Sequence, residues 1–220
     1  MKVKICGVTR PTDAQLAEES GAHYVGAVLV PGSPRQVSPE LAGTLAGSVT
    51  IPLVVVVAGL SPRQTANLAR VAGASVIQLH GEEAARHVHV LRELGDWELW
   101  KAVRVRTGAD ITEAADTFGG VVELLLLDAW HPSALGGTGM SFDWSEAAAC
   151  RSRLSPGLRL GVAGGLTPEN VGEVVRLLAP DLVDVVSGVE ASPGIKDPDR
   201  VRSFVRRARG NDFGAPPAGT

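Results

Sequence analysis

The sequence predicts an α/β protein, a (β/α)8 TIM barrel with a parallel eight-stranded sheet. The first observation is that eight short apolar runs alternate with eight Ala-rich helical stretches. Such alternation is typical of parallel βα units, whose crossover helices cover a buried sheet. The second is that eight units fill about 210 of the 220 residues, a length that suits a compact barrel. The alternative, a doubly wound open sheet, more often carries a Gly-rich loop after its first strand, and none follows Ile5.

The predicted strands are short and dominated by aliphatic residues. Leu53 to Val57 is almost pure valine, which is typical of a strand buried on both faces. Leu124 to Leu127 is a run of four leucines that ends in Asp128. In chain order, we expect the strands at 3–5, 24–29, 53–57, 76–79, 99–103, 124–127, 160–162 and 182–186.

Start and stop signals place the helices between these strands. Ser38 and Asp197 precede prolines and are expected to be N-caps, because proline suits the first helical position. Gly21 and Gly73 are expected to end two helices. In chain order, the helices are expected at 11–20, 39–47, 62–73, about 82–94, 111–117, 144–151, 168–178 and 198–209.

Composition bounds the domain organisation and the class of protein. No linker divides the chain, so we expect one barrel domain over 1–209 and a flexible C-terminal tail over 210–220. The 21 Lys and Arg against 24 Asp and Glu exclude the basic surface of a nucleic-acid binder. No apolar run approaches the ~18 residues of a membrane span. Only two cysteines, Cys6 and Cys150, and no visible signal peptide favour a reducing, cytoplasmic location.

Polar residues that follow the predicted strands are the candidates for chemistry, because barrel active sites lie at the carboxyl ends of strands. Cys6 follows the first strand, where its thiol is either a small buried side chain or a base. Asp128 follows the sixth strand. It is either part of a loop ion pair or a helix cap, or a general acid whose carboxyl group is partly desolvated at the end of a buried strand. A thiolate base and a carboxylic acid suit an isomerisation, which moves a proton without net redox change.

Two further features indicate a small anionic ligand. Gly164-Gly165 and Ser187-Gly188 follow strands seven and eight, where many barrels hold a phosphate on backbone N–H groups. Arg35 is either a clamp for a carboxylate or half of a surface ion pair. His80 is a catalyst or a supporting histidine. No Cys/His or acidic cluster has metal-ligand spacing, so no metal is expected.

Seven segments, in order from about Val3 to Phe204, resemble the phosphoribosylanthranilate isomerase family. Each is a weak signal alone, but the ordered set is highly specific. The segments are 4–10 (KICGVTR), 30–35 (VPGSPR), 78–82 (QLHGE), 126–128 (LLD), 136–139 (GGTG) with 142–144 (FDW), 163–166 (AGGL) with 169–171 (ENV), and 187–190 (SGVE) with 193–194 (PG) and 196–197 (KD).

The resemblance implies an Amadori rearrangement in tryptophan biosynthesis, on a (β/α)8 barrel without cofactor. N-(5-phosphoribosyl)anthranilate becomes 1-(2-carboxyphenylamino)-1-deoxyribulose 5-phosphate. By motif, Asp128 is the general acid, Cys6 the general base and Arg35 the holder of the anthranilate carboxylate. The resemblance also implies phosphate binding by backbone groups near Gly164, Gly165, Ser187 and Gly188. From their places after strands four and six, His80 and Gly139 of the Gly-rich loop 136–139 are expected as further substrate contacts. The only expected partner is this phosphorylated small molecule, and monomer and homodimer both stay open.

Three positions depart from the family's pattern, and other functions stay open. Val57 stands where the family usually has Phe, Ala27 where it commonly has Phe, and Val186 where it commonly has Ser. These departures predict a looser pocket and favour, as one alternative, a phosphate-binding barrel without catalysis. The sugar isomerase barrel of histidine synthesis needs Asp at Cys6, and indole-glycerol phosphate synthase needs a Lys/Glu-rich site.

Overall fold

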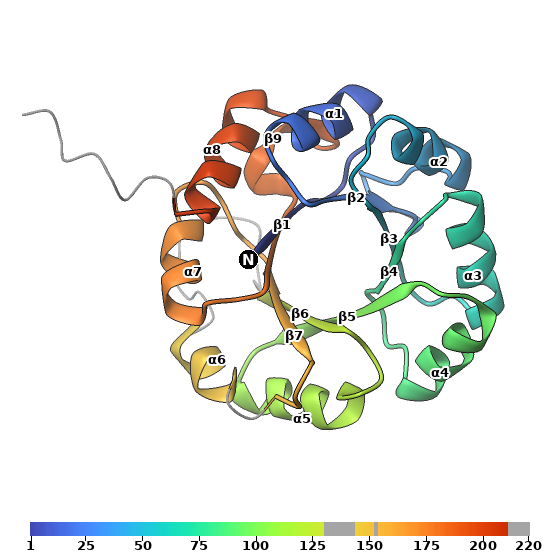
Figure 1. Ribbon diagram of the computed structural model, residues 1–220, viewed down its shortest axis with the longest axis vertical. Coiled ribbons are helices and arrows are strands. Elements are labelled where there is room, and N and C mark those ends of the chain that lie inside the picture. The colour runs from blue at the N-terminus through green and yellow to red at the C-terminus, as the bar shows by residue number, and fades with distance from the viewer. Residues whose placement is uncertain (130–143, 152–153, 211–220) are drawn as a thin grey trace, which may run out of the picture.

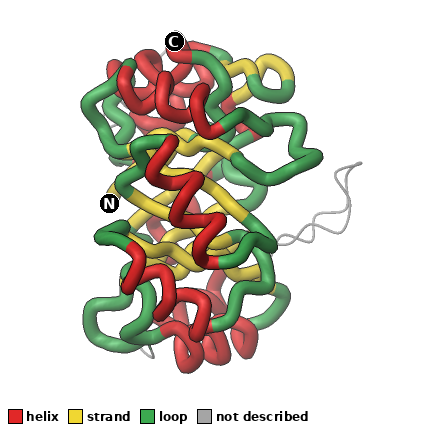
Figure 2. The backbone as a smooth tube through the Cα atoms, turned by 90° about the vertical axis from the view of Figure 1, so that its right-hand side faces the viewer, coloured by secondary structure: helices red, strands yellow, loops and turns green. Residues whose placement is uncertain are grey.

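A computed structural model describes residues 1–129, 144–151 and 154–210. Strands β1 to β8 form a closed parallel barrel in chain order, and the helices surround it (Figure 1). Figure 2 shows the strands running obliquely inside this layer of helices. The predicted (β/α)8 TIM barrel is confirmed. The open-sheet alternative is wrong, because β1 pairs with β8 as well as with β2 and the sheet has no edge.

The strands and helices follow the predicted alternation. The strands are β1 Lys2–Ile5, β2 Tyr24–Val28, β3 Leu53–Val57, β4 Val76–Leu79, β5 Glu98–Val105, β6 Leu124–Ala129, β7 Arg159–Ala163 and β8 Leu182–Val185. The helices are α1 Pro11–Glu19, α2 Pro39–Gly47, α3 Pro62–Val71, α4 Ala85–Leu94, α5 Gly108–Phe118, α6 Trp144–Arg151, α7 Val171–Leu178 and α8 Pro198–Ala208. Helix α8 packs beside α1 and closes the ring (Figure 1).

Local hydrogen bonds explain where the helices begin. Ser38 accepts a bond from the Leu41 amide at 3.2 Å, and Asp197 accepts two from the first turn of α8, so both predicted N-caps are confirmed. Helix α4 begins at Ala85, later than predicted, because the Glu83 carboxylate accepts bonds from the Gly59 and Gly81 amides and holds this stretch as a loop.

After β8 the chain forms a short turn and hairpin that the sequence analysis did not predict. A 3-10 turn, η1 Ser187–Val189, leads into an antiparallel hairpin of β9 Glu190–Ser192 and β10 Ile195–Lys196. Strands of two and three residues carry too little periodicity to be predicted. This hairpin places Glu190 at the mouth of the barrel, where it contacts Arg35.

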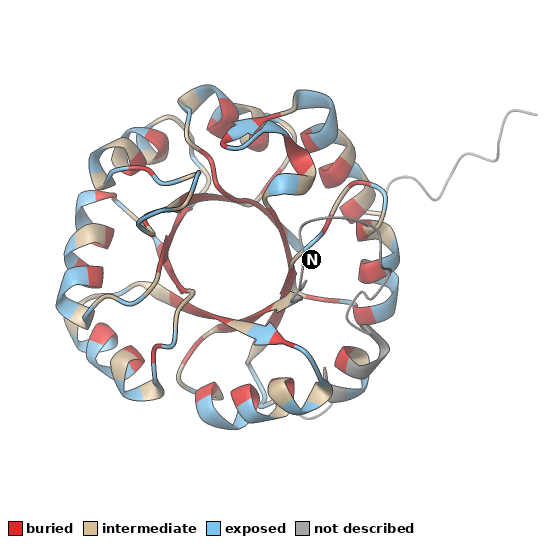
Figure 3. Cartoon of the chain, turned by 180° about the vertical axis from the view of Figure 1, so that it is seen from behind, coloured by how far each residue is buried: buried red, intermediate tan, exposed pale blue. Residues whose placement is uncertain are grey.

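Two cores hold the fold together. The larger lies between the sheet and the buried faces of the helices, while the outer helix faces are exposed (Figure 3). The smaller lies inside the barrel, where the Tyr24 ring packs edge-on against Trp100 with ring centroids 5.0 Å apart. Three polar side chains, Lys4, Gln78 and Asp184, are buried at the barrel interior, and the candidate site lies above them.

No helix in the described ranges is long and apolar enough to cross a membrane. From residue 211 on, the predicted tail lies outside the described residues, as does the Gly-rich segment 136–139.

Candidate active site

A cavity of about 310 Å³ opens at the carboxyl ends of the strands. It brings together residues from seven strands or their following loops, which lie far apart in the sequence. Seven of the predicted site residues line it: Cys6, Arg35, His80, Asp128, Gly164, Gly165 and Ser187. Gly188 does not line it, and Gly139 lies outside the described residues.

The thiol of Cys6 is buried at the floor of the cavity, where the side chain is only 3% exposed. Burial raises the pKa of this thiol above its usual range, the Lys4 ammonium opposes that rise, and the Asp184 carboxylate adds to it. Cys6 therefore rests as a thiol in the free protein, with a cation beside it that favours the thiolate.

A buried ion pair lies beneath the cavity. The Lys4 ammonium donates to Asp184 Oδ2 at 2.9 Å and to Gln78 Oε1 at 2.8 Å. Burial alone would lower the pKa of Lys4, but the negative charges of Asp184 and the Cys6 thiolate outweigh it and raise the pKa. Asp184 Oδ1 has no hydrogen-bond partner among the described residues, and Asp184 lines the cavity. That oxygen is thus a buried acceptor without a partner in the described part of the chain, on a residue that lines the cavity.

His80 and Asp128 face each other across the ends of β4 and β6. His80 Nε2 lies 3.5 Å from Asp128 Oδ2, and His80 Nδ1 lies 3.2 Å from Gln78 Nε2. The Asp128 side chain keeps 29% of its surface exposed, so the strand end removes only part of the water from its carboxyl group. Asp128 is therefore reachable from the cavity, and among the described residues His80 is its ion-pair partner.

Arg35 combines the two roles that its sequence position left open. Its guanidinium makes a bidentate ion pair with Glu190, with Nε at 2.8 Å and Nη2 at 2.6 Å from the carboxylate oxygens. Arg35 also lines the cavity, and its Nη1 has no partner among the described residues. Lys196 holds the same carboxylate at 3.0 Å. Glu190 thus fixes one edge of the guanidinium and leaves another edge for a ligand.

The glycines after β7 and β8 have different structural roles. Gly164 and Gly165 have φ values of 84° and 64°, a region that favours glycine, and both line the cavity with Ser187. A Cβ at Gly188 would lie 2.0 Å from the carbonyl oxygen of Leu166. Gly188 therefore allows the two loops to pack closely, which positions Ser187 rather than itself at the cavity.

Comparisons with known proteins decide the family. The family described as N-(5'phosphoribosyl)anthranilate (PRA) isomerase matches residues 3–207. The N-(5'-phosphoribosyl)anthranilate isomerase of Paracoccus denitrificans is 43% identical over 213 residues, which cover 94% of this chain and 97% of the relative. The chain belongs to the phosphoribosylanthranilate isomerase family. The resemblance drawn from the ordered segments is confirmed. The predicted activity, that of an aldose–ketose isomerase of tryptophan biosynthesis, is confirmed with it.

Solved structures of family members have the same fold. One is phosphoribosyl anthranilate isomerase in complex with reduced 1-(o-carboxyphenylamino)-1-deoxyribulose 5-phosphate, with TM-score 0.84, 34% identity, and coverage of 96% of this chain and 99% of that one. Another shows mutually generated monomers of the dimeric enzyme from Thermotoga maritima, with TM-score 0.83, 35% identity and the same coverage of both chains.

Only one of the three departures from the family's pattern lies at the cavity. Val186 lines it, together with an apolar wall of Val28, Val30, Val56, Ala163 and Leu166. Val57 and Ala27 instead pack in the outer core, between the sheet and the helices. The expectation that Val57 and Ala27 loosen the pocket is therefore wrong, because alternate residues of a strand face opposite sides of the sheet.

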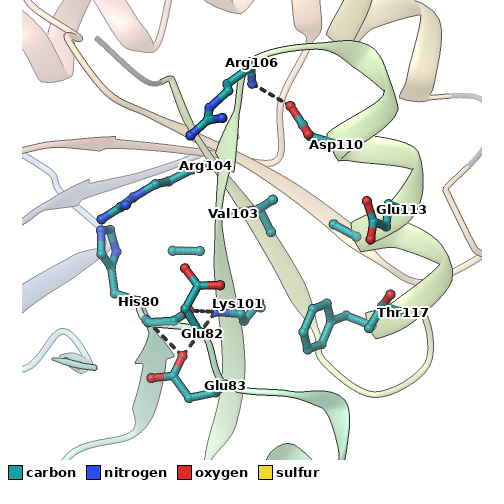
Figure 4. A pocket seen from close by; sticks show the side chains of 14 residues that line it. His80, Glu82, Glu83, Lys101, Val103, Arg104, Arg106, Asp110, Glu113 and Thr117 are labelled. Carbon is teal, nitrogen blue, oxygen red and sulfur yellow. Dashed lines mark hydrogen bonds and ion pairs between the residues drawn. The ribbon is translucent and has the colours of Figure 1, made fainter. Parts of the chain in front are cut away.

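A second cavity, of about 410 Å³, lies between the end of β5, helix α5 and the loop after β4. It shares His80 with the first cavity and is lined by charges of both signs (Figure 4). At its base the Lys101 ammonium lies 3.1 Å from Glu83 Oε2 and also donates to the Gly81 carbonyl. This buried pair ties β5 to the loop that carries His80.

Sequence reasoning missed four residues that shape the site: Lys4, Gln78, Asp184 and Glu190. The first three are polar residues inside short apolar runs, and that interruption was a readable signal. Glu190 had no such signal, since its partner Arg35 is 155 residues away. Among the described residues, no group of three His, Cys, Asp or Glu is placed to hold a metal ion.

Proposed function

We propose that this cavity carries out the family's reaction, the isomerisation of N-(5-phosphoribosyl)anthranilate, with Asp128 as general acid and Cys6 as general base. The observation that carries the proposal is that both side chains line one cavity from different strands, β1 and β6. An Amadori rearrangement needs one group that gives a proton and one that takes a proton on opposite parts of the same sugar.

The first step is opening of the ribose ring. The Asp128 carboxyl gives its proton to the ring oxygen, the C1–O bond breaks, and the electron pair of the anthranilate nitrogen forms a Schiff base with C1. Asp128 is left as a carboxylate beside the Nε2 side of His80. Its partial exposure to the cavity lets it reach the substrate.

The second step removes the proton from C2. The Cys6 thiolate takes it, the C2–H electron pair forms a C1–C2 double bond, and the C1–N double-bond pair returns to the anthranilate nitrogen. The enolamine then becomes the ketone as a proton adds at C1 and the hydroxyl on C2 loses its proton. The buried Lys4 ammonium favours the thiolate that this step needs. The Asp184 carboxylate, which lines the cavity, accepts a hydrogen bond from a sugar hydroxyl and so orients C2 toward the thiol.

Arg35 and the two glycine-containing loops bind the anionic ends of the substrate. The edge of Arg35 that Glu190 leaves open pairs with the anthranilate carboxylate, and the apolar wall contacts the aromatic ring. The phosphate binds at the amides of Gly164, Gly165 and Ser187, with Gly188 in support. Gly139 is proposed as a further contact because it belongs to the Gly-rich loop that follows β6 in the sequence.

The remaining proposals concern the organisation of the chain. Residues 1–209 form one domain with a tail over 210–220, so deletion of the tail leaves folding and turnover unchanged. A free buried thiol fits a reducing cytoplasm, which cell fractionation tests. The family includes a dimeric enzyme, so we propose a homodimer or a monomer, which light scattering on the purified chain distinguishes.

The test is turnover of freshly prepared N-(5-phosphoribosyl)anthranilate by the wild type, Cys6→Ser and Asp128→Asn. We expect kcat of each variant to fall by at least about 100-fold, which is the rate enhancement that a general acid or base typically contributes. The circular dichroism spectrum of each variant should stay native. Full activity in either variant would remove that residue from the mechanism. A wild type that binds phosphate esters without turnover would favour the non-catalytic barrel instead.

A further inference from the structure

A chain of polar contacts runs from β1 to β6 at the cavity. Lys4 Nζ donates a buried hydrogen bond to Gln78 Oε1 at 2.8 Å, and Gln78 Nε2 lies 3.2 Å from His80 Nδ1. His80 Nε2 lies 3.5 Å from Asp128 Oδ2, and both of these side chains are partly exposed. The mechanism above uses Asp128 as the acid and Lys4 as the cation beside Cys6, which leaves Gln78 and His80 to be explained.

Lys4 determines which groups donate and which accept along this chain. An ammonium group has donors only, so it turns the oxygen of the Gln78 amide toward itself. The amide nitrogen, which also has donors only, then faces His80 Nδ1, and Nδ1 must accept. A neutral imidazole that accepts at Nδ1 carries its proton on Nε2, and that N–H faces the Asp128 carboxyl group.

His80 also lies among charged groups of both signs that line the two cavities. Figure 4 shows the Arg104 side chain extending from β5 toward the His80 ring, at the edge of the second cavity. An imidazolium would also need a proton on Nδ1, where the Gln78 amide already donates. The charged or titratable groups that line the two cavities with His80 are Cys6, Arg35, Asp128 and Asp184 on one side, and Glu82, Glu83, Lys101, Arg104, Arg106, Asp110 and Glu113 on the other.

We propose that Lys4 and Gln78 are positioning residues that hold His80 as the neutral Nε2–H tautomer, whose N–H faces Asp128. The proposal rests on the proposed role of Asp128 as general acid. A neutral N–H at 3.5 Å from Asp128 Oδ2 presents a donor to that oxygen without placing a full positive charge beside it.

The Gln78 amide also disfavours the other neutral tautomer. With its proton on Nδ1, His80 would point an N–H at the donor nitrogen of Gln78, 3.2 Å away, and the two donors would repel.

The tautomer is measured directly by long-range 1H–15N NMR of the full chain without substrate, with the His80 signals identified by their absence in His80→Asn. At neutral pH we expect a protonated Nε2 and an unprotonated Nδ1. An imidazolium or an Nδ1–H form in the wild type would overturn the proposal. Because no substrate is present, this result is independent of whether Asp128 is the acid, which the Asp128→Asn turnover test decides.

Two variants of one residue link the tautomer to catalysis. Gln78→Glu keeps the acceptor for Lys4 but offers His80 a second acceptor, so His80 is expected to become protonated at Nδ1. Gln78→Met keeps the volume and removes both bonds. We expect Gln78→Glu to lower kcat by about 10- to 100-fold, more than Gln78→Met, with KM changed less than twofold. An altered His80 spectrum in Gln78→Glu with unchanged kcat would overturn the positioning role.

Discussion

The thiol of Cys6 occupies space that a side chain at Gly26 would fill. A Cβ on Gly26 would lie 2.7 Å from Cys6 Sγ and 2.8 Å from Lys4 Cε. Such distances are shorter than van der Waals contact, so the sulfur and the ammonium stem would both have to move. A residue without functional groups, on the neighbouring strand β2, thus sets the position of the proposed base and of the cation beside it.

Replacing Gly26 should therefore impair chemistry more than folding. Gly26→Ala displaces the thiol, and a displacement near 1 Å at a reacting group lowers kcat by about 100-fold. Gly172→Ala is the matched control, because a Cβ there meets nothing within 4 Å. In helix α7 it should keep full activity and add about 0.5–1 kcal/mol to the free energy of unfolding. Steady-state kinetics and urea unfolding check both, and full activity in Gly26→Ala would contradict the placement of the thiol.

The rate should depend on pH through Cys6. Because burial raises the pKa of this thiol, kcat/KM of the wild type should still be rising above about pH 8.5, the usual value for a free thiol. Lys4→Met removes the charge that lowers the pKa of Cys6 and leaves the Asp184 carboxylate that raises it. The increase of kcat/KM with pH should therefore occur at higher pH in this variant. A kcat/KM profile that is flat from about pH 7 to 10 would show that the thiol is not the base.

The Arg35–Glu190 pair should act on substrate binding. Glu190→Gln removes one charge of the bidentate pair and frees the guanidinium to rotate, so KM should rise by about 10- to 100-fold with little change in kcat. Arg35→Lys, which loses the planar fork, should have a similar effect. Asp199→Asn breaks the exposed pair with Arg202 and is the control, with KM expected to stay unchanged. A loss confined to kcat would instead place Arg35 in the chemical step.

The sequence predicted the parts of the site that follow apolar runs. Cys6, Asp128 and the glycine pairs could be placed because a barrel brings all strand ends to one face. Lys4, Gln78 and Asp184 interrupt apolar runs in the sequence, but their meeting inside the barrel could not be predicted, because which face of each strand points inward depends on the register of the closed barrel. For the same reason, the valine at position 57 was assigned to the pocket, although it faces the helices.

Removing one partner of the Lys4–Asp184 pair should destabilise the fold more than replacing both partners by apolar residues. Asp184→Leu leaves a buried ammonium without its counter-charge, which should lower the free energy of unfolding by about 3–5 kcal/mol. Lys4→Met leaves the carboxylate unpaired and should cost a similar amount. The double variant buries no unpaired charge, so it should be more stable than the sum of the two losses by at least about 2 kcal/mol, although its activity is lost. Urea unfolding of the four proteins measures this coupling, and additive losses would mean that the two charges do not stabilise each other in the folded barrel.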